Sequence, residues 1–187
     1  MKTYVLLYKG FVQFEVVLAN CFLRNKSEII TFATEERTFT SLEGFQTIPH
    51  QTIDEIDPDE VDILLIPGGE PEDLTGAEEL YELVRQLDEK GKFIGAICAG
   101  PVHLARAGVL KGRKYTTTVP VEEMPEFAGG NYQDQNVVVD GNIITAKASG
   151  YVDFALEAGR IMDIYEDEAD YQETVRYFKY FNQERED

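Results

Sequence analysis

Three short apolar segments, each followed by a segment with helical spacing, constrain the fold of this chain more than any other feature. They cover residues 3–8, 61–66 and 92–97. Their nearly continuous apolar character is typical of strands that are buried on both faces of a parallel sheet. Such strands need helices on both sides of the sheet. The alternation therefore predicts an α/β fold with a doubly wound, mainly parallel sheet joined by right-handed crossovers.

The remaining segments extend this alternation. Apolar residues at helical spacing predict helices over residues 11–24, 77–89, 101–110 and 151–165. Strands or short hairpin segments are expected over residues 28–33, 39–52 and 115–119. Asp140-Gly141-Asn142 is a strong tight-turn signal, so we expect a hairpin between residues 137–139 and 143–146.

We expect residues 1–187 to form a single domain, because no repeat, low-complexity segment or linker interrupts the pattern. Residues 166–187 mix charged side chains with Tyr171, Val175, Phe178 and Phe181. They are predicted to form an amphipathic helical extension that packs on the domain or on a partner. Packing into the core is the favoured prediction.

The charge of the chain limits its partners. It has 35 Asp and Glu against 17 Lys and Arg, a formal net charge of −18. Such a field repels phosphate backbones and anionic lipid surfaces, so we expect neither a nucleic acid nor a membrane as a partner. No apolar segment approaches the ~20 residues that span a bilayer, and the first residues lead directly into a predicted strand. We therefore expect a cytoplasmic protein.

Two cysteines, Cys21 and Cys98, lie far apart in the sequence and in different kinds of element. This arrangement indicates neither a disulfide framework nor paired zinc ligands, and we expect no metal and no cofactor. Cys21 lies on the apolar face of the first predicted helix. Packing in the core is the favoured interpretation for this residue.

Cys98 occupies a sharp strand-to-helix turn. It follows the predicted strand 92–97 and precedes a helix with Pro101 in its first turn. The small neighbours Ala99 and Gly100 suit a strained turn whose central side chain points into a cleft. A helix N-terminus favours the thiolate, which lowers a thiol pKa, and its free amides can hold a developing oxyanion. From position alone, a buried cysteine that acts as a small hydrophobe is an equally good interpretation.

These residues carry a resemblance to a known family. The sequence Ala-Ile-Cys-Ala-Gly-Pro at 96–101, together with Ile-Pro-Gly-Gly at 66–69, resembles the ThiJ/PfpI superfamily. Residues 8–15 and 153–157 are similar to the first turn and the last sheet-covering helix of that superfamily. The resemblance implies a flavodoxin-like, three-layer α/β/α sandwich of the class I glutamine amidotransferase-like type.

The resemblance also implies functions for individual residues. Cys98 would be the reactive nucleophile and Glu15 the acidic residue that contacts its sulfur. A protonated carboxyl group can donate a hydrogen bond to a thiolate and, later, to a sulfinate. Gly68 and Gly69 would present backbone amides to the same cleft and, with the Ala99 amide, could form an oxyanion hole. A plain tight turn is an equally good interpretation of the two glycines.

The sequence departs from the family pattern because no catalytic histidine is evident. Protease-like members place a histidine directly after the nucleophile, where this chain has Ala99, and others carry one in the strand that follows, where this chain has 116–120 (Thr-Thr-Thr-Val-Pro). His103 lies about 140° around the helix from Cys98 at roughly 100° per residue, so we expect a structural or surface position for it. His50 has no partner that the sequence identifies. Peptide hydrolysis is therefore disfavoured, unless a partner subunit of an expected homodimer supplies the group.

Three functional hypotheses follow. The first is a cysteine-dependent hydrolase, lyase or hydratase that acts on a small carbonyl-type electrophile through Cys98 and Glu15. The second is a redox or stress-response sensor in which Cys98 oxidises, reversibly or to the sulfinic acid. The third is an interaction module that binds a partner through the acidic, aromatic segment 171–181.

Overall fold

The computed structural model describes residues 1–182 of the chain. Its main sheet has the strand order β10-β11-β7-β6-β1-β2-β5. The strands of this sheet are β1 (Lys2–Leu6), β2 (Glu28–Ala33), β5 (Gln51–Thr52), β6 (Ile63–Ile66), β7 (Phe93–Ile97), β10 (Val137–Asp140) and β11 (Ile143–Ala146). All neighbouring strands are parallel except β10 and β11. The predicted mainly parallel α/β fold is confirmed.

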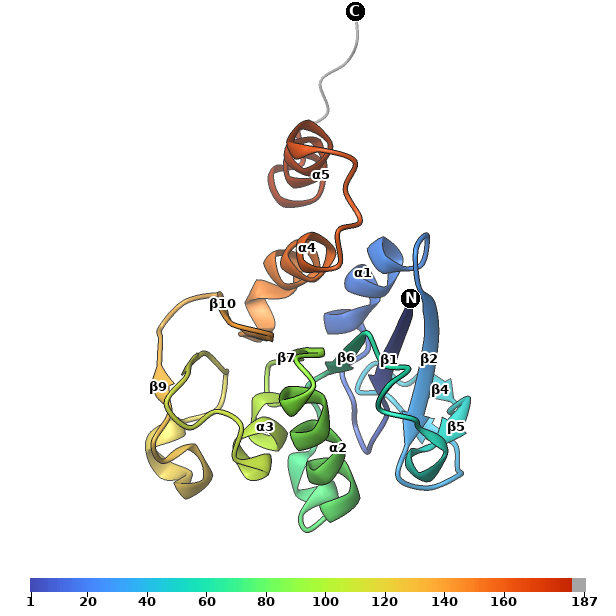
Figure 1. Cartoon of the computed structure of the whole chain (residues 1–187), viewed down its shortest axis with the longest axis vertical. Coiled ribbons are helices and arrows are strands. Elements are labelled where there is room, and N and C mark those ends of the chain that lie inside the picture. The colour runs from blue at the N-terminus through green and yellow to red at the C-terminus, as the bar shows by residue number, and fades with distance from the viewer. Residues whose placement is uncertain (183–187) are drawn as a thin grey trace, which may run out of the picture.

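Helices cover both faces of the main sheet (Figure 1). The helices α1 (Phe14–Leu23) and α4 (Tyr151–Ile161) lie on one face, and α2 (Glu78–Glu89) and α3 (Pro101–Ala107) lie on the other. Alternate residues of β6 contribute to different cores: Leu65 packs with α1 and α4, whereas Ile66 packs with α2 and α3. This is why β6 is a continuous apolar run in the sequence.

The strand order brings three turns to one edge of the sheet. β1 pairs with β2 on one side and with β6 on the other, so the strand order reverses its direction across the sheet at β1. Ligands bind at such a switch point, outside the carboxyl ends of the strands. The turns that follow β1, β6 and β7 all lie at this edge.

Smaller elements lie outside the main sheet. Two pairs of short strands are β3 (Phe39–Thr40) with β4 (Gln46–Thr47), and β8 (Lys114–Tyr115) with β9 (Asn131–Tyr132). Short 3-10 helices are η1 (Ile53–Glu55), η2 (Pro71–Leu74), η3 (Val121–Glu123), η4 (Pro125–Phe127) and η5 (Ala148–Gly150). The hairpin predicted around Gly141 is confirmed, and that glycine has a φ of 64°.

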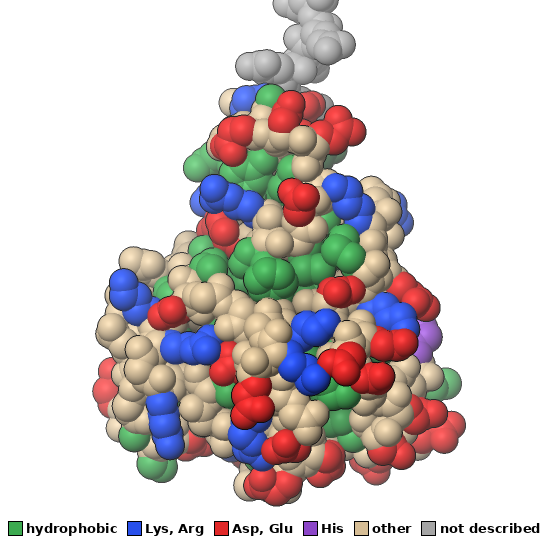
Figure 2. Space-filling model, viewed as in Figure 1, with side chains coloured by type: hydrophobic (Ala, Val, Ile, Leu, Met, Phe, Trp, Pro, Cys, Tyr) green, Lys and Arg blue, Asp and Glu red, His purple; other side chains and the backbone are tan. Residues whose placement is uncertain are grey.

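The C-terminal helix α5 (Glu168–Tyr180) forms as predicted, but the prediction that it packs into the core is wrong. None of its residues is buried. It lies on α4, beyond the rest of the fold (Figure 1), and Lys179 Nζ pairs with Asp153 Oδ1 of α4 at 2.6 Å. The ring of Phe178 packs on that of Phe22 of α1, with ring centroids 4.9 Å apart. Its apolar side chains alternate with charged ones, so only a narrow stripe can be covered. Hydrophobic side chains remain exposed around α4 and α5, in the upper half of Figure 2.

No helix within residues 1–182 combines the length and the apolar character that crossing a membrane requires.

Candidate active site

Cys98 connects β7 to α3 in a strained backbone conformation. Its φ of 61° lies in the left-handed region, which costs a residue other than glycine about 1–3 kcal/mol. The turn is held by two backbone hydrogen bonds, from the Cys98 N–H to the Ala146 carbonyl (2.9 Å) and from the Gly100 N–H to the Ile97 carbonyl (2.8 Å). A Cβ at Gly100 would lie 2.4 Å from the Ile66 carbonyl oxygen, so only glycine fits there. The predicted strand-to-helix turn is confirmed.

Glu15 lies in the first turn of α1 and is 1% exposed. Its Oε2 atom accepts a hydrogen bond of 2.8 Å from the Gly68 N–H, and its side chain is hydrogen-bonded to that of Cys98. A Cβ at Gly68 would lie 2.8 Å from this Oε2 and 2.9 Å from the Cys98 Sγ. The absence of a side chain at position 68 therefore lets the carboxyl group and the sulfur meet.

The two acidic groups perturb each other. Burial raises the pKa of Glu15, although the hydrogen bonds from Gly68 and Cys98 oppose this effect. Burial and the Glu15 carboxylate raise the pKa of Cys98 to about 11. The two groups therefore titrate as a coupled pair, and moving one proton between the sulfur and the carboxyl group leaves the net charge of the site unchanged.

This result differs from the expectation that a helix N-terminus lowers the pKa of Cys98. The Ala99 N–H does donate to the sulfur and does lower the pKa of the thiol. Burial and a neighbouring carboxylate outweigh that single amide, because both destabilise a second negative charge in the same enclosed space.

Thr118 is a site residue that the sequence analysis missed. Its Oγ1 accepts a hydrogen bond of 3.0 Å from the Ala148 N–H, and its hydroxyl bonds to the Cys98 side chain, which lowers the pKa of the thiol. The segment is anchored to the Cys98 carbonyl by the Thr118 N–H (3.0 Å) and the Thr117 hydroxyl (2.7 Å).

The predicted strand 115–119 is therefore shorter than expected. β8 ends at Tyr115, because the threonines that follow bond to Cys98 and to Thr145 instead of to a neighbouring strand. The available signal in the sequence was the run of three hydroxyl side chains at residues 116–118.

Comparison with known proteins now identifies the family. The DJ-1/PfpI family model matches residues 1–160. The chain belongs to the DJ-1/PfpI family. It is 35% identical to a deglycase of Thermococcus kodakarensis over 152 residues, which are 80% of this chain and 92% of that protein. It is 37% identical to the deglycase PfpI of Pyrococcus furiosus over 124 residues, 66% of this chain and 75% of that protein.

Solved structures agree with this assignment. A DJ-1 superfamily protein from Agrobacterium tumefaciens superposes with a TM-score of 0.82 at 26% identity, covering 96% of this chain and 99% of the other. The resemblance predicted from the sequence is thus confirmed, and so is the flavodoxin-like fold of the DJ-1/PfpI family.

Within the described residues of this DJ-1/PfpI protein, neither histidine is hydrogen-bonded to the Cys98 sulfur. His103 is fully buried in α3, where its ring packs edge to face on Tyr8 with ring centroids 5.2 Å apart. Burial lowers the pKa of His103 to about 3, so its ring is neutral at physiological pH. His50 is exposed, and its Nδ1 accepts a hydrogen bond from the Thr31 N–H at 2.9 Å. The structural position predicted for His103 is consistent with this packing.

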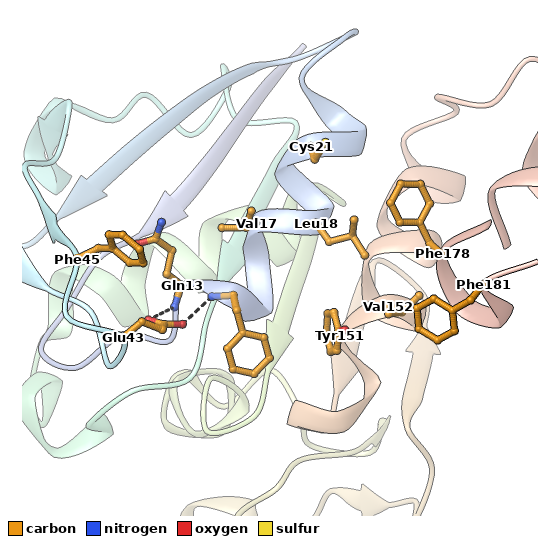
Figure 3. A pocket seen from close by; sticks show the side chains of 11 residues that line it. Gln13, Val17, Leu18, Cys21, Glu43, Phe45, Tyr151, Val152, Phe178 and Phe181 are labelled. Atoms are coloured by element: carbon orange, nitrogen blue, oxygen red, sulfur yellow. Dashed lines mark hydrogen bonds between the residues drawn. The ribbon is translucent and has the colours of Figure 1, made fainter. Parts of the chain in front are cut away.

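Cys21 is exposed, so the prediction that it packs in the core is wrong. It lines an apolar groove of about 540 Å³ between α1, α4 and α5 (Figure 3). The Glu43 carboxylate lies at one end of the groove, where it accepts hydrogen bonds from the N–H groups of Gln13 (3.2 Å) and Phe14 (2.8 Å).

The homodimer expected from the sequence stays a prediction.

Proposed function

We propose that this chain is a cysteine-dependent enzyme that acts on a small carbonyl-type electrophile, with Cys98 as the nucleophile and Glu15 as the proton carrier. The observation that carries the proposal is the buried Glu15 carboxyl group, hydrogen-bonded both to the Cys98 side chain and to the Gly68 amide. A nucleophile and a proton-transfer group in hydrogen-bond contact form the minimal apparatus for covalent catalysis.

The first chemical step balances within this pair. The Glu15 carboxylate takes the thiol proton, and the sulfur electron pair then forms a C–S bond to the carbonyl carbon. The electron pair of the C=O π bond moves to oxygen, and Glu15 returns its proton to that oxygen. The product is a hemithioacetal, and Glu15 ends the step as the carboxylate with which it began.

Neighbouring groups would assist this step. The Thr118 hydroxyl and the Ala99 N–H donate to the sulfur, which stabilises the transient thiolate. After the C–S bond forms, the sulfur no longer carries charge, and the Ala99 amide, with that of Gly69, would be free to bond the new oxyanion. The Gly68 amide already donates to Glu15, so its proposed contribution is to hold the proton carrier.

The class of substrate is supported by relatives that are named deglycases. A deglycase substrate is an adduct between a carbonyl compound and an amine, and such an adduct can present an electrophilic carbon to a thiolate. Peptide hydrolysis is disfavoured, because expulsion of a poor amine leaving group needs an acid that the neutral, buried His103 cannot supply.

The test measures turnover of two substrates, an α-oxoaldehyde and its adduct with N-acetyl-lysine. Turnover is monitored as the loss of the carbonyl compound. We expect Cys98→Ala to abolish turnover, and Cys21→Ser, the matched change at the exposed cysteine, to retain it. Circular dichroism would establish that both variants fold. Full activity in Cys98→Ala would exclude the proposed mechanism.

A redox sensor is the second candidate. The Thr118 hydroxyl, the Ala99 N–H and a protonated Glu15 surround the sulfur, and the same donors could bond the oxygens of a sulfinate. A peroxide would supply both oxygens in two successive O–O cleavages at the sulfur, releasing water each time. Mass spectrometry after mild peroxide treatment distinguishes this candidate, since a sensor requires Cys98 to oxidise faster than the exposed Cys21.

A further inference from the structure

Tyr8 contacts all three elements that build the site. It lies just after β1, is fully buried, and its hydroxyl donates a hydrogen bond of 2.8 Å to the Pro67 carbonyl. A Cβ at Gly69 would lie 2.7 Å from its ring, so the ring packs directly against the turn after β6. The His103 ring, from the helix that follows Cys98, packs on Tyr8.

The hydrogen bond from the Tyr8 hydroxyl to the Pro67 carbonyl holds the peptide group that faces Glu15. The Pro67 carbonyl and the Gly68 N–H belong to the same peptide unit, which is planar. Tyr8 donates to the oxygen of this unit, and the amide of the same unit donates to the Glu15 carboxylate at 2.8 Å. Rotation of this peptide would therefore break both hydrogen bonds together.

The two hydrogen bonds also reinforce each other. A donor at a carbonyl oxygen polarises the peptide and makes its N–H a stronger donor. The Gly68 carbonyl is held as well, by the Val12 N–H at 2.9 Å. The peptide that faces Glu15 is thus fixed from both sides by the chain that leads from Tyr8 to α1.

We propose that Tyr8 is a positioning residue, whose hydroxyl orients the Pro67–Gly68 peptide and thereby sets how Glu15 and Cys98 share their proton. The Gly68 amide stabilises the carboxylate form of Glu15 and so keeps the proton on the sulfur. Weakening this bond moves the proton toward the carboxyl group and leaves more thiolate. The proposal deepens the proposed function, since it rests on the coupling of Glu15 to Cys98.

The experiment measures the pH dependence of Cys98 alkylation by iodoacetamide, with Cys21→Ser in every variant so that one thiol reacts. Tyr8→Phe removes the hydroxyl and keeps the ring. We expect its alkylation rate near neutral pH to rise about 3- to 10-fold, the size of one net hydrogen bond, because the share of thiolate in a pair that holds one proton does not depend on pH. Tyr81→Phe is the matched control. Tyr81 lies on α2 and is buried, and its hydroxyl also donates to a backbone carbonyl, that of Leu74, at 2.6 Å.

The same measurement in a Glu15→Gln background tests the route of the effect. There the Tyr8→Phe rate increase should vanish, because no carboxyl group remains to exchange a proton with the sulfur. A rate increase that persists in Glu15→Gln, or equal rates near neutral pH for Tyr8→Phe and Tyr81→Phe, overturns the proposal. Failure of the chain to turn over any carbonyl substrate would reject the proposed function alone, because alkylation does not require turnover.

If Tyr8→Phe does not fold, Gly69→Ala replaces it. The added Cβ would lie 2.7 Å from the Tyr8 ring and displace it. The displacement should weaken the same hydrogen bonds and raise the alkylation rate near neutral pH, as Tyr8→Phe does. An unchanged rate in folded Gly69→Ala would count against the proposal.

Discussion

The Glu15 carboxyl group meets the Cys98 sulfur across the bare Cα of Gly68. Both groups are acids, and burial raises the pKa of each. Their contact therefore does not make a permanently ionised thiolate. It makes a coupled pair between which a proton can move, and the movement of that proton leaves the charge of the site unchanged.

Replacing Glu15 by Gln should separate thiol reactivity from turnover. The Glu15 carboxylate raises the pKa of Cys98, so its loss should shift the pH profile of alkylation to lower values. Turnover should nevertheless fall by at least about 10²-fold, because an amide cannot carry the proton to the new oxyanion. Parallel iodoacetamide and carbonyl-turnover assays check both effects. Alkylation at unchanged or higher pH would refute the coupling of the two residues.

The Thr118 hydroxyl should act in the opposite direction. Its hydrogen bond lowers the pKa of Cys98, so Thr118→Val should raise the pH at which the thiol is alkylated. We expect a shift of about half a unit to one unit, as for loss of one hydrogen bond. Thr118→Ser keeps the hydroxyl and is the matched control. Equal profiles for the Val and Ser variants would show that the hydroxyl does not act on the sulfur.

His103 should make the protein sensitive to acid. Its pKa is lowered to about 3 by burial, whereas the unfolded chain binds a proton near the ordinary value of 6.5. Between these values only the unfolded state is protonated, so the free energy of unfolding should decline by about 1.4 kcal/mol per pH unit as the pH falls below 6.5. Above that value the contribution is constant.

His103→Phe should remove this part of the pH dependence. Within the described residues neither ring nitrogen of His103 has a hydrogen-bond partner, so an apolar ring should also be tolerated at neutral pH. Urea unfolding of wild type and variant at pH 7, 6 and 5 measures the difference in slope. The same slope in both proteins would contradict the assignment of the acid sensitivity to His103.

Removal of residues 167–187 should leave the thiol chemistry intact. The described part of α5 buries none of its residues, and its contacts are with α1 and α4, away from the turns that surround Cys98. We expect a modest loss of thermal stability and an unchanged alkylation profile. Unfolding of the shortened chain would mean that α5 is structurally essential. Loss of a partner without loss of thiol reactivity would favour the interaction-module hypothesis.

The main sheet and the Cys98 turn could be predicted because their signals are local. Strands buried on both faces are continuous apolar runs, and the turn is bounded by small residues and Pro101. Glu15 could be predicted only from the family resemblance. In helical spacing alone it is an ordinary acidic residue, and its burial depends on Gly68, which is distant in the sequence.

The errors have different physical causes. α1 is apolar on more of its surface than the sheet can cover, so spacing could not separate the buried Ala19 from the exposed Cys21. Thr118 reaches the sulfur because the chain after β8 runs past the end of β11, where Thr118 accepts a hydrogen bond from the Ala148 N–H. β11 pairs with β7, the strand that leads to Cys98. No local pattern encodes such a contact, because it depends on the path of the backbone through two other elements.

The left-handed backbone of Cys98 has a stereochemical consequence. The sulfur is fixed by the turn, and Glu15, Gly68 and Thr118 occupy defined directions around it. In the proposed addition, an aldehyde would have to offer one of its two faces to the sulfur while its oxygen reaches the proton of Glu15. The new carbon centre should therefore form with a single handedness, and an achiral aldehyde whose new centre is retained should give one enantiomer.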